Sequence, residues 1–161
     1  MKKTFILLLF LPLWAGLLNG QTKADLADCI KIALASPEME AAFTQEWGEK
    51  RPLYLQKPER RDIAPQPIDE LMGQLEAEDF SGFQWEVMPA TPEAIRQLPV
   101  DELSFGVLNL GATYRESWNA MSLNLFVALP QYPRRWLAGS FVLAKEDERW
   151  QIVQKSVDIR P

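Results

Sequence analysis

The segment covering residues 118–157 constrains the fold most, because its side chains alternate as they do in paired strands. Residues 119–129 (NAMSLNLFVAL) show the period-two pattern of a strand with one buried face. One face would carry Met121, Leu123, Leu125, Val127 and Leu129, and the other Ser122, Asn124, Phe126 and Ala128. The two faces of this strand are therefore predicted to lie in different environments.

The residues that follow predict a β-hairpin. Residues 136–144 (WLAGSFVLA) are hydrophobic and β-prone, and residues 145–149 (KEDER) supply a charged turn. Residues 150–157 (WQIVQKSV) would then form a second strand that pairs with residues 136–144. Upstream, residues 102–110 (ELSFGVLNL) would begin the same sheet, and residues 111–117 would form a polar connection. The C-terminal part of the chain is thus predicted to be a sheet.

The N-terminal part predicts helices. Residues 23–36 place hydrophobic side chains at helical spacing, and residues 38–48 repeat this pattern as a second helix or as a continuation bent at Pro37. A further helix is predicted for residues 68–78, and Thr91 followed by Pro92 is typical of a helix start.

Shorter elements connect these helices. Residues 52–55 and 82–88 read as strands, whereas residues 57–67 hold three prolines and five charges and predict an exposed loop. The predicted fold class is α+β, with N-terminal helices packed on one face of a C-terminal curved antiparallel sheet of three to five strands.

Residues 1–20 have the three parts of a secretory signal peptide. Lys2 and Lys3 precede a hydrophobic run at residues 5–18, and a small residue, Gly20, closes the segment. The run is shorter than the roughly 20 residues that span a bilayer, although an uncleaved membrane anchor is the alternative. We therefore expect export to a periplasmic or extracellular location, no stable membrane span after cleavage, and one α+β domain at residues 21–161.

Charge and residue usage narrow the function. The net charge is −5, and it becomes −7 without residues 1–20, which hold two lysines and no acid; this argues against a nucleic-acid partner. The chain has no histidine, which removes serine–histidine–aspartate triads, cysteine–histidine pairs and most zinc sites. Cys29 is the only cysteine, so no intramolecular disulfide can form. No catalytic residue, metal or cofactor is predicted.

Carboxylates are the remaining source of catalysis. Glu46 with Glu49, Glu76 with Asp79, and residues 146–148 form acidic pairs, each at a place where solvated charge is expected. A hydrolase or isomerase that uses two carboxylates in a pocket between sheet and helices is therefore kept as an alternative function.

A candidate binding surface follows from the strand pattern. Five of the six tryptophans lie after residue 20, and most would fill the core. Phe126 and Trp136, however, fall on the face opposite the hydrophobic row, together with Asn124 and Ser140. A face that mixes large aromatic and small polar groups is typical of a partner or dimer surface. A β-bulge between these positions would reverse their assignment.

Three short segments carry a resemblance to a known family. Residues 119–121 (NAM), 139–145 (GSFVLAK) and 149–153 (RWQIV) resemble the closing strands of exported bacterial proteins of the NTF2-like (cystatin-like) α+β type. The resemblance implies a curved sheet wrapped by helices, sometimes with a pocket, and often a dimer formed through the sheet. It implies no single activity, and this chain lacks the aspartate–histidine pairs of the catalytic members.

The resulting functional prediction is an exported, non-catalytic binding or protein-interaction domain. Its partner would be a protein, a small molecule or a second copy of the chain bound through the sheet face, and its binding residues would be Asn124, Phe126, Trp136 and Ser140. The alternatives are the carboxylate enzyme and an envelope-associated structural accessory protein.

Overall fold

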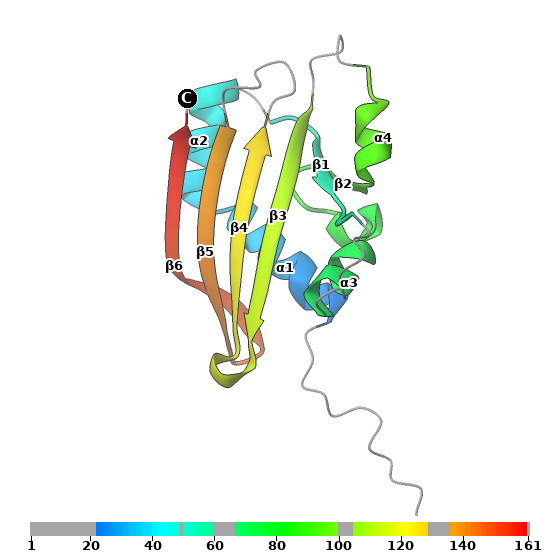
Figure 1. Cartoon of the computed structure of the whole chain (residues 1–161). Coiled ribbons are helices and arrows are strands. Elements are labelled where there is room, and N and C mark those ends of the chain that lie inside the picture. The colour runs from blue at the N-terminus through cyan, green and yellow to red at the C-terminus, as the bar shows by residue number, and fades with distance from the viewer. Residues whose placement is uncertain (1–21, 49, 60–66, 100–104, 129–135, 161) are drawn as a thin grey trace, which may run out of the picture.

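The computed structural model describes residues 22–48, 50–59, 67–99, 105–128 and 136–160. A six-stranded sheet forms one layer, and helices α1 and α2 form a second layer behind it (Figure 1). The α+β class is therefore confirmed. The predicted signal peptide, Leu129 and most of the proline-rich loop at residues 57–67 lie outside the described residues.

Helices α1 (Lys23–Leu34) and α2 (Pro37–Trp47) are two separate helices rather than one bent helix. Thr22 caps α1 through a reciprocal pair of hydrogen bonds with Asp25. Ser36 caps α2, because its hydroxyl accepts a hydrogen bond from the backbone N–H of Met39, with a separation of 3.4 Å. The serine–proline pair that ends the first hydrophobic run thus also starts the second helix.

The sheet is larger than predicted. Its strands are β1 (Leu53–Gln56), β2 (Val87–Ala90), β3 (Gly106–Arg115), β4 (Ala120–Ala128), β5 (Trp136–Glu146) and β6 (Arg149–Arg160), in the order β2-β1-β3-β4-β5-β6. Strand β1 runs parallel to β2 and β3, and the remaining pairs are antiparallel. The prediction of an antiparallel sheet of three to five strands was wrong, because each connection into β2 and β3 contains a helix and returns the chain in the same direction.

Shorter helices fill these connections. They are α3 (Pro67–Gly73), the 3-10 turn η1 (Ala77–Phe80) and α4 (Pro92–Arg96), whereas a second 3-10 turn, η2 (Glu116–Trp118), joins β3 to β4. The helix predicted for residues 68–78 is shorter than expected and ends at Gly73, whose carbonyl accepts a hydrogen bond from Lys57. The start at Thr91 and Pro92 is confirmed.

Two of the predicted strand limits were wrong. Residues 82–86 are not a strand, because the pairing of β2 with β1 begins only at Val87. Trp85 is buried in the core and packs against Phe43 with ring centroids 4.4 Å apart. Residues 111–115 continue β3 instead of forming a connection, and Tyr114 lies opposite Met121 in the register.

The core lies between the sheet and helices α1 and α2. Fully buried helix residues include Leu26, Ile30 and Leu34, and they meet the row predicted from the alternation in β4. That row consists of Met121, Leu123, Leu125 and Val127, all at 0% exposure. Cys29 is buried in the same cluster, and this burial raises the pKa of its thiol.

The β5–β6 hairpin is confirmed, with its turn at Asp147 and Glu148, both at positive φ. A bulge interrupts the pairing between Val142 and Leu143 and leaves Val153 without an opposite residue. Because this irregularity lies on β6, the alternation in β4 and β5 is unaffected.

Candidate binding face

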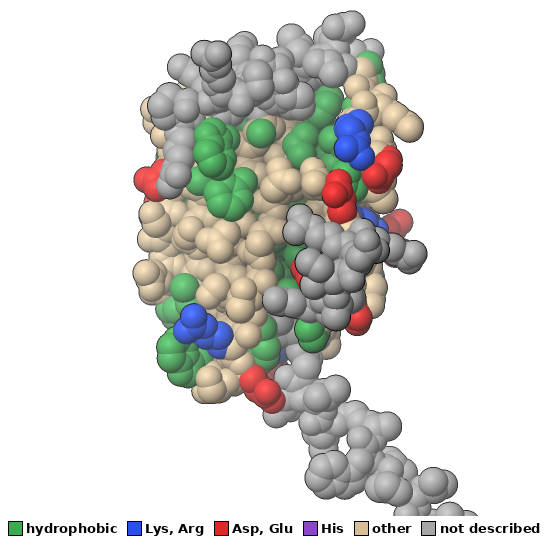
Figure 2. All heavy atoms as spheres, in the orientation of Figure 1, with side chains coloured by type: hydrophobic (Ala, Val, Ile, Leu, Met, Phe, Trp, Pro, Cys, Tyr) green, Lys and Arg blue, Asp and Glu red, His purple; other side chains and the backbone are tan. Residues whose placement is uncertain are grey.

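The candidate site is the outer face of the sheet, which we define as the side of β3 to β6 that points away from α1 and α2. Two adjacent rows cross this face in register: Gly111, Asn124, Ser140 and Ser156, followed by Thr113, Ser122, Val142 and Gln154. Figure 2 shows this face from the front, with hydrophobic groups gathered toward its two ends and a band without charged side chains between them.

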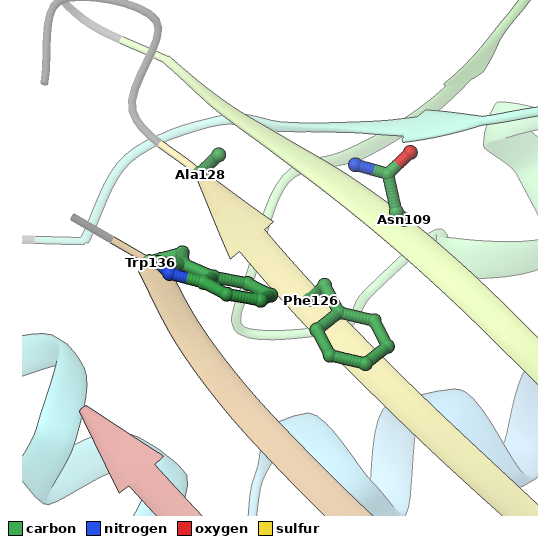
Figure 3. A pocket seen from close by; sticks show the side chains of 4 residues that line it. All are labelled: Asn109, Phe126, Ala128 and Trp136. Carbon is green, nitrogen blue, oxygen red and sulfur yellow. The ribbon is translucent and has the colours of Figure 1, made fainter. Parts of the chain in front are cut away.

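One end of the outer face carries an aromatic pair. The rings of Phe126 and Trp136 have centroids 5.6 Å apart, with an angle of 32° between their planes. They remain 37% and 39% exposed, although both are large hydrophobic side chains. Together with Asn109 and Ala128 they line a hollow of about 400 Å³ (Figure 3). The hollow spans three neighbouring strands, since Asn109 lies opposite Phe126 on β3.

The two rows given above form a polar belt that follows the aromatic pair along the strands. Asn124 and Ser140 lie opposite each other, and the Ser140 hydroxyl donates a hydrogen bond of 2.8 Å to Oδ1 of Asn124. The structure therefore brings all four predicted residues onto one face: Phe126 and Trp136 form the aromatic pair, and Asn124 and Ser140 form the next row. That they bind a partner stays a prediction.

The other end of the face holds a second aromatic group that the sequence did not reveal. Trp118, in turn η2, is 67% exposed, and the guanidinium of Arg115 lies 4.9 Å from the centre of its ring. Asn109 was also missed. The alternation of Val107 and Asn109 with Leu108 and Leu110 was the available signal for it.

A second polar cluster lies on the helix side. Oδ1 of Asp25 accepts hydrogen bonds from Nζ of Lys145 at 3.0 Å and from Nε1 of Trp150 at 2.9 Å. Burial raises the pKa of the Asp25 carboxyl, but hydrogen bonds from Trp150, Lys145 and Thr22 outweigh burial and lower the pKa from 3.8 to about 2. Lys145, predicted as part of a solvated turn, instead connects helix α1 to the β5–β6 hairpin.

The predicted acidic pairs have structural contacts. Asp79 accepts a hydrogen bond from the backbone N–H of Glu76 at 2.8 Å and forms an ion pair with Lys23 at 3.0 Å. Glu148 lies at the exposed tip of the hairpin, with a carboxylate oxygen 3.5 Å from Lys145. Glu49, the partner of Glu46 in the sequence prediction, lies outside the described residues. Asp79 and Glu148 therefore have structural roles, in helix capping and ion pairing for Asp79 and in ion pairing for Glu148.

Comparison of the chain with protein-family models, with curated proteins and with solved structures finds no match. The resemblance to NTF2-like proteins therefore stays a prediction. In the part of the chain that the structure describes, no helix is long and hydrophobic enough to cross a membrane.

Proposed function

We propose that this protein is an exported, non-catalytic binding domain and that its binding surface is the outer face of the sheet. The observation that carries the proposal is the pairing of Phe126 with Trp136 beside a hollow, on the face that α1 and α2 leave uncovered. The volume of about 400 Å³ lies within the range of small-ligand sites.

Aromatic rings that stay exposed to water carry a free-energy cost. Hydrophobic surface that a ligand removes from water contributes roughly 25 cal/mol per Å². On the inner face, the alternate residues Leu125 and Val127 already supply the core contacts of β4. The exposed part of Phe126 is therefore free to contribute to binding a partner.

The alternative of a carboxylate enzyme has less support. Among the acids predicted for it, Asp79 caps a helical turn and pairs with Lys23, and Glu148 lies beside Lys145. Asp25 is unsuited as well, because a general acid needs a pKa near the working pH and the pKa of Asp25 is lowered to about 2. Its carboxylate stays ionised and bound to Lys145 and Trp150. This arrangement suits a structural ion pair.

Fragment mapping by NMR tests whether the outer face is a binding surface. We expect small aromatic and amide probes to shift the signals of Asn109, Phe126 and Trp136 in the wild type. The double variant Phe126→Ser, Trp136→Ser should bind the probes with an affinity lower by about tenfold or more. Val153→Ser is the matched control, because Val153 is an exposed hydrophobic residue at the bulge in β6, and it should leave the probe affinities unchanged.

Circular dichroism and thermal unfolding of each variant would show that the fold is retained. Sedimentation of the wild type at rising concentration would show whether a second copy of the chain occupies the face. Probes that collect elsewhere on the molecule, or that bind the double variant as well as the wild type, would refute the proposal.

A further inference from the structure

The order of chemical groups along the outer face suggests a class of ligand, provided that this face is the binding surface proposed above. Aromatic side chains lie toward both ends, with Phe126 and Trp136 at one end and Trp118 at the other. Between them, the rows of Asn124 and Ser122 carry hydroxyl and amide groups. The face therefore has a polar centre and hydrophobic ends.

This order is the reverse of that in a protein–protein interface. Such interfaces bury a hydrophobic and aromatic centre inside a polar rim. A protein partner laid on this face would cover Asn124, Ser140 and Ser156 at its centre, and it would need to match each of their polar groups to avoid a desolvation cost. The arrangement favours a ligand that is itself polar along its length.

The belt is also uncharged. The two central rows hold Gly, Asn, Ser, Thr, Val and Gln side chains and no acid or base. Among the described residues of this face, charged ones stand only at the margins of the belt. At the end of the aromatic pair, Asp158 and Arg160 on β6 lie opposite Ala138 and Trp136 in the register. At the other end, Arg115 lies beside Trp118, and Glu146 lies opposite Arg149. A charged ligand along the belt would lose hydration without gaining an ionic partner, so charge complementarity favours a neutral ligand.

Hydroxyl and amide groups both donate and accept hydrogen bonds, as the hydroxyl groups of sugars do. The C–H faces of a sugar ring are apolar and carry slight positive charge, which suits the negative face of an aromatic ring. We propose that the outer face binds an uncharged oligosaccharide that lies along β4 and β5, with one sugar ring on Phe126 and Trp136 and a distant ring near Trp118.

The length of the belt favours an extended chain. Ala120 and Phe126 are six residues apart on β4, and a strand advances about 3.3 Å per residue, so the two ends are separated by about 20 Å. A single sugar ring would reach only one aromatic end. Binding should therefore strengthen with chain length until both ends are in contact.

Titration calorimetry with defined oligosaccharides tests this proposal on the chain from residue 21 onward. The neutral probes are cellohexaose, xylohexaose, maltohexaose and N-acetylchitohexaose, each compared with its disaccharide, and the acidic probe is hexagalacturonate. We expect at least one neutral hexasaccharide to bind and to bind more tightly than its disaccharide. Trp136→Ala should lower the affinity for that hexasaccharide by about tenfold or more. Asn124→Ala should lower it by about threefold to tenfold.

Two further variants check the geometry. Trp118→Ala should lower the affinity for the hexasaccharide and leave the affinity for the disaccharide unchanged, whereas Val153→Ser should change neither affinity. The proposal is overturned if no neutral hexasaccharide binds at millimolar concentration, if hexagalacturonate binds equally well, or if the wild type forms a dimer through this face. Fragment probes that still map to the hollow would then show that the face binds something other than a sugar.

Discussion

The two faces of strand β4 share one backbone but differ in the burial and the chemistry of their side chains. On the inner face, Leu123 and Leu125 are fully buried against the helix layer. On the outer face, their sequence neighbours Asn124 and Phe126 are exposed and lie in the polar belt and the aromatic pair. The alternation of side chains thus separates stability from surface chemistry within one strand, so adjacent residues should respond differently to mutation.

The largest effect is expected from a hydrophobic truncation on the inner face. Leu123→Ala should lower the free energy of unfolding by about 2–5 kcal/mol, because it removes buried methyl groups and leaves a cavity. The adjacent outer-face change Ser122→Ala is the control and should stay within about 0.5 kcal/mol. Urea unfolding followed by circular dichroism measures both, and similar losses for the two variants would contradict the separation of the faces.

Two glycines in the sheet also differ in the space around them, according to the face on which they lie. A Cβ at Gly139, on the inner face, would lie 2.7 Å from Phe141 and 3.0 Å from the sulfur of Met39, whereas a Cβ at Gly111, on the outer face, would lie no closer than 3.8 Å to Asn124. Gly139→Ala should therefore destabilise the protein by about 1–3 kcal/mol through overpacking.

The matched change Gly111→Ala should be neutral or slightly stabilising, because glycine in a strand has excess freedom in the unfolded chain. Thermal unfolding compares the two variants directly. An equal fall in the melting temperature of both would show that the outer face is as tightly packed as the inner one.

A smaller effect, dependent on pH, is expected at the helix side. The pKa of Asp25 in the folded protein is about 2, below its ordinary value of 3.8, so the ionised carboxylate stabilises the fold above about pH 4, and this contribution disappears as the pH falls toward 2. Asp25→Asn should cost about 1–2 kcal/mol near neutral pH and progressively less below about pH 4.

Asp28→Asn is the control, since Asp28 is 55% exposed and pairs only with Lys31 in the contacts shown by the structure. Its effect should be small at every pH. Urea unfolding between about pH 2 and pH 7 measures both variants. A loss of stability for Asp25→Asn that stays constant across this range would contradict the assigned role of the carboxylate.

The sequence predicted the features that depend on local periodicity. The alternation in residues 119–129 correctly placed Leu123 and Asn124 on opposite faces. The alternation in the next strand correctly placed Trp136 on the same face as Phe126. Strands β1 and β2 have four residues each, too few to reveal their parallel pairing, which is set by the helical connections between them.

Other features depend on contacts between distant parts of the chain. The small and polar residues at 111–115 resembled a loop because the outer face of β3 is exposed there. The contact of Asp25 with Lys145 joins residues 120 positions apart and has no local signal. Trp118 was not predicted for the outer face because its position depends on the η2 turn between two strands.

The contact of Asp25 with the final hairpin also sets when the protein can fold during synthesis. Helix α1 leaves the ribosome early, but Lys145 and Trp150, which hold its first turn, follow Asp25 by 120 and 125 residues. Until then the helix has no complete sheet on which to bury Leu26 and Ile30. We therefore expect the N-terminal part of the nascent chain to stay without its native packing until Trp150 has left the ribosome.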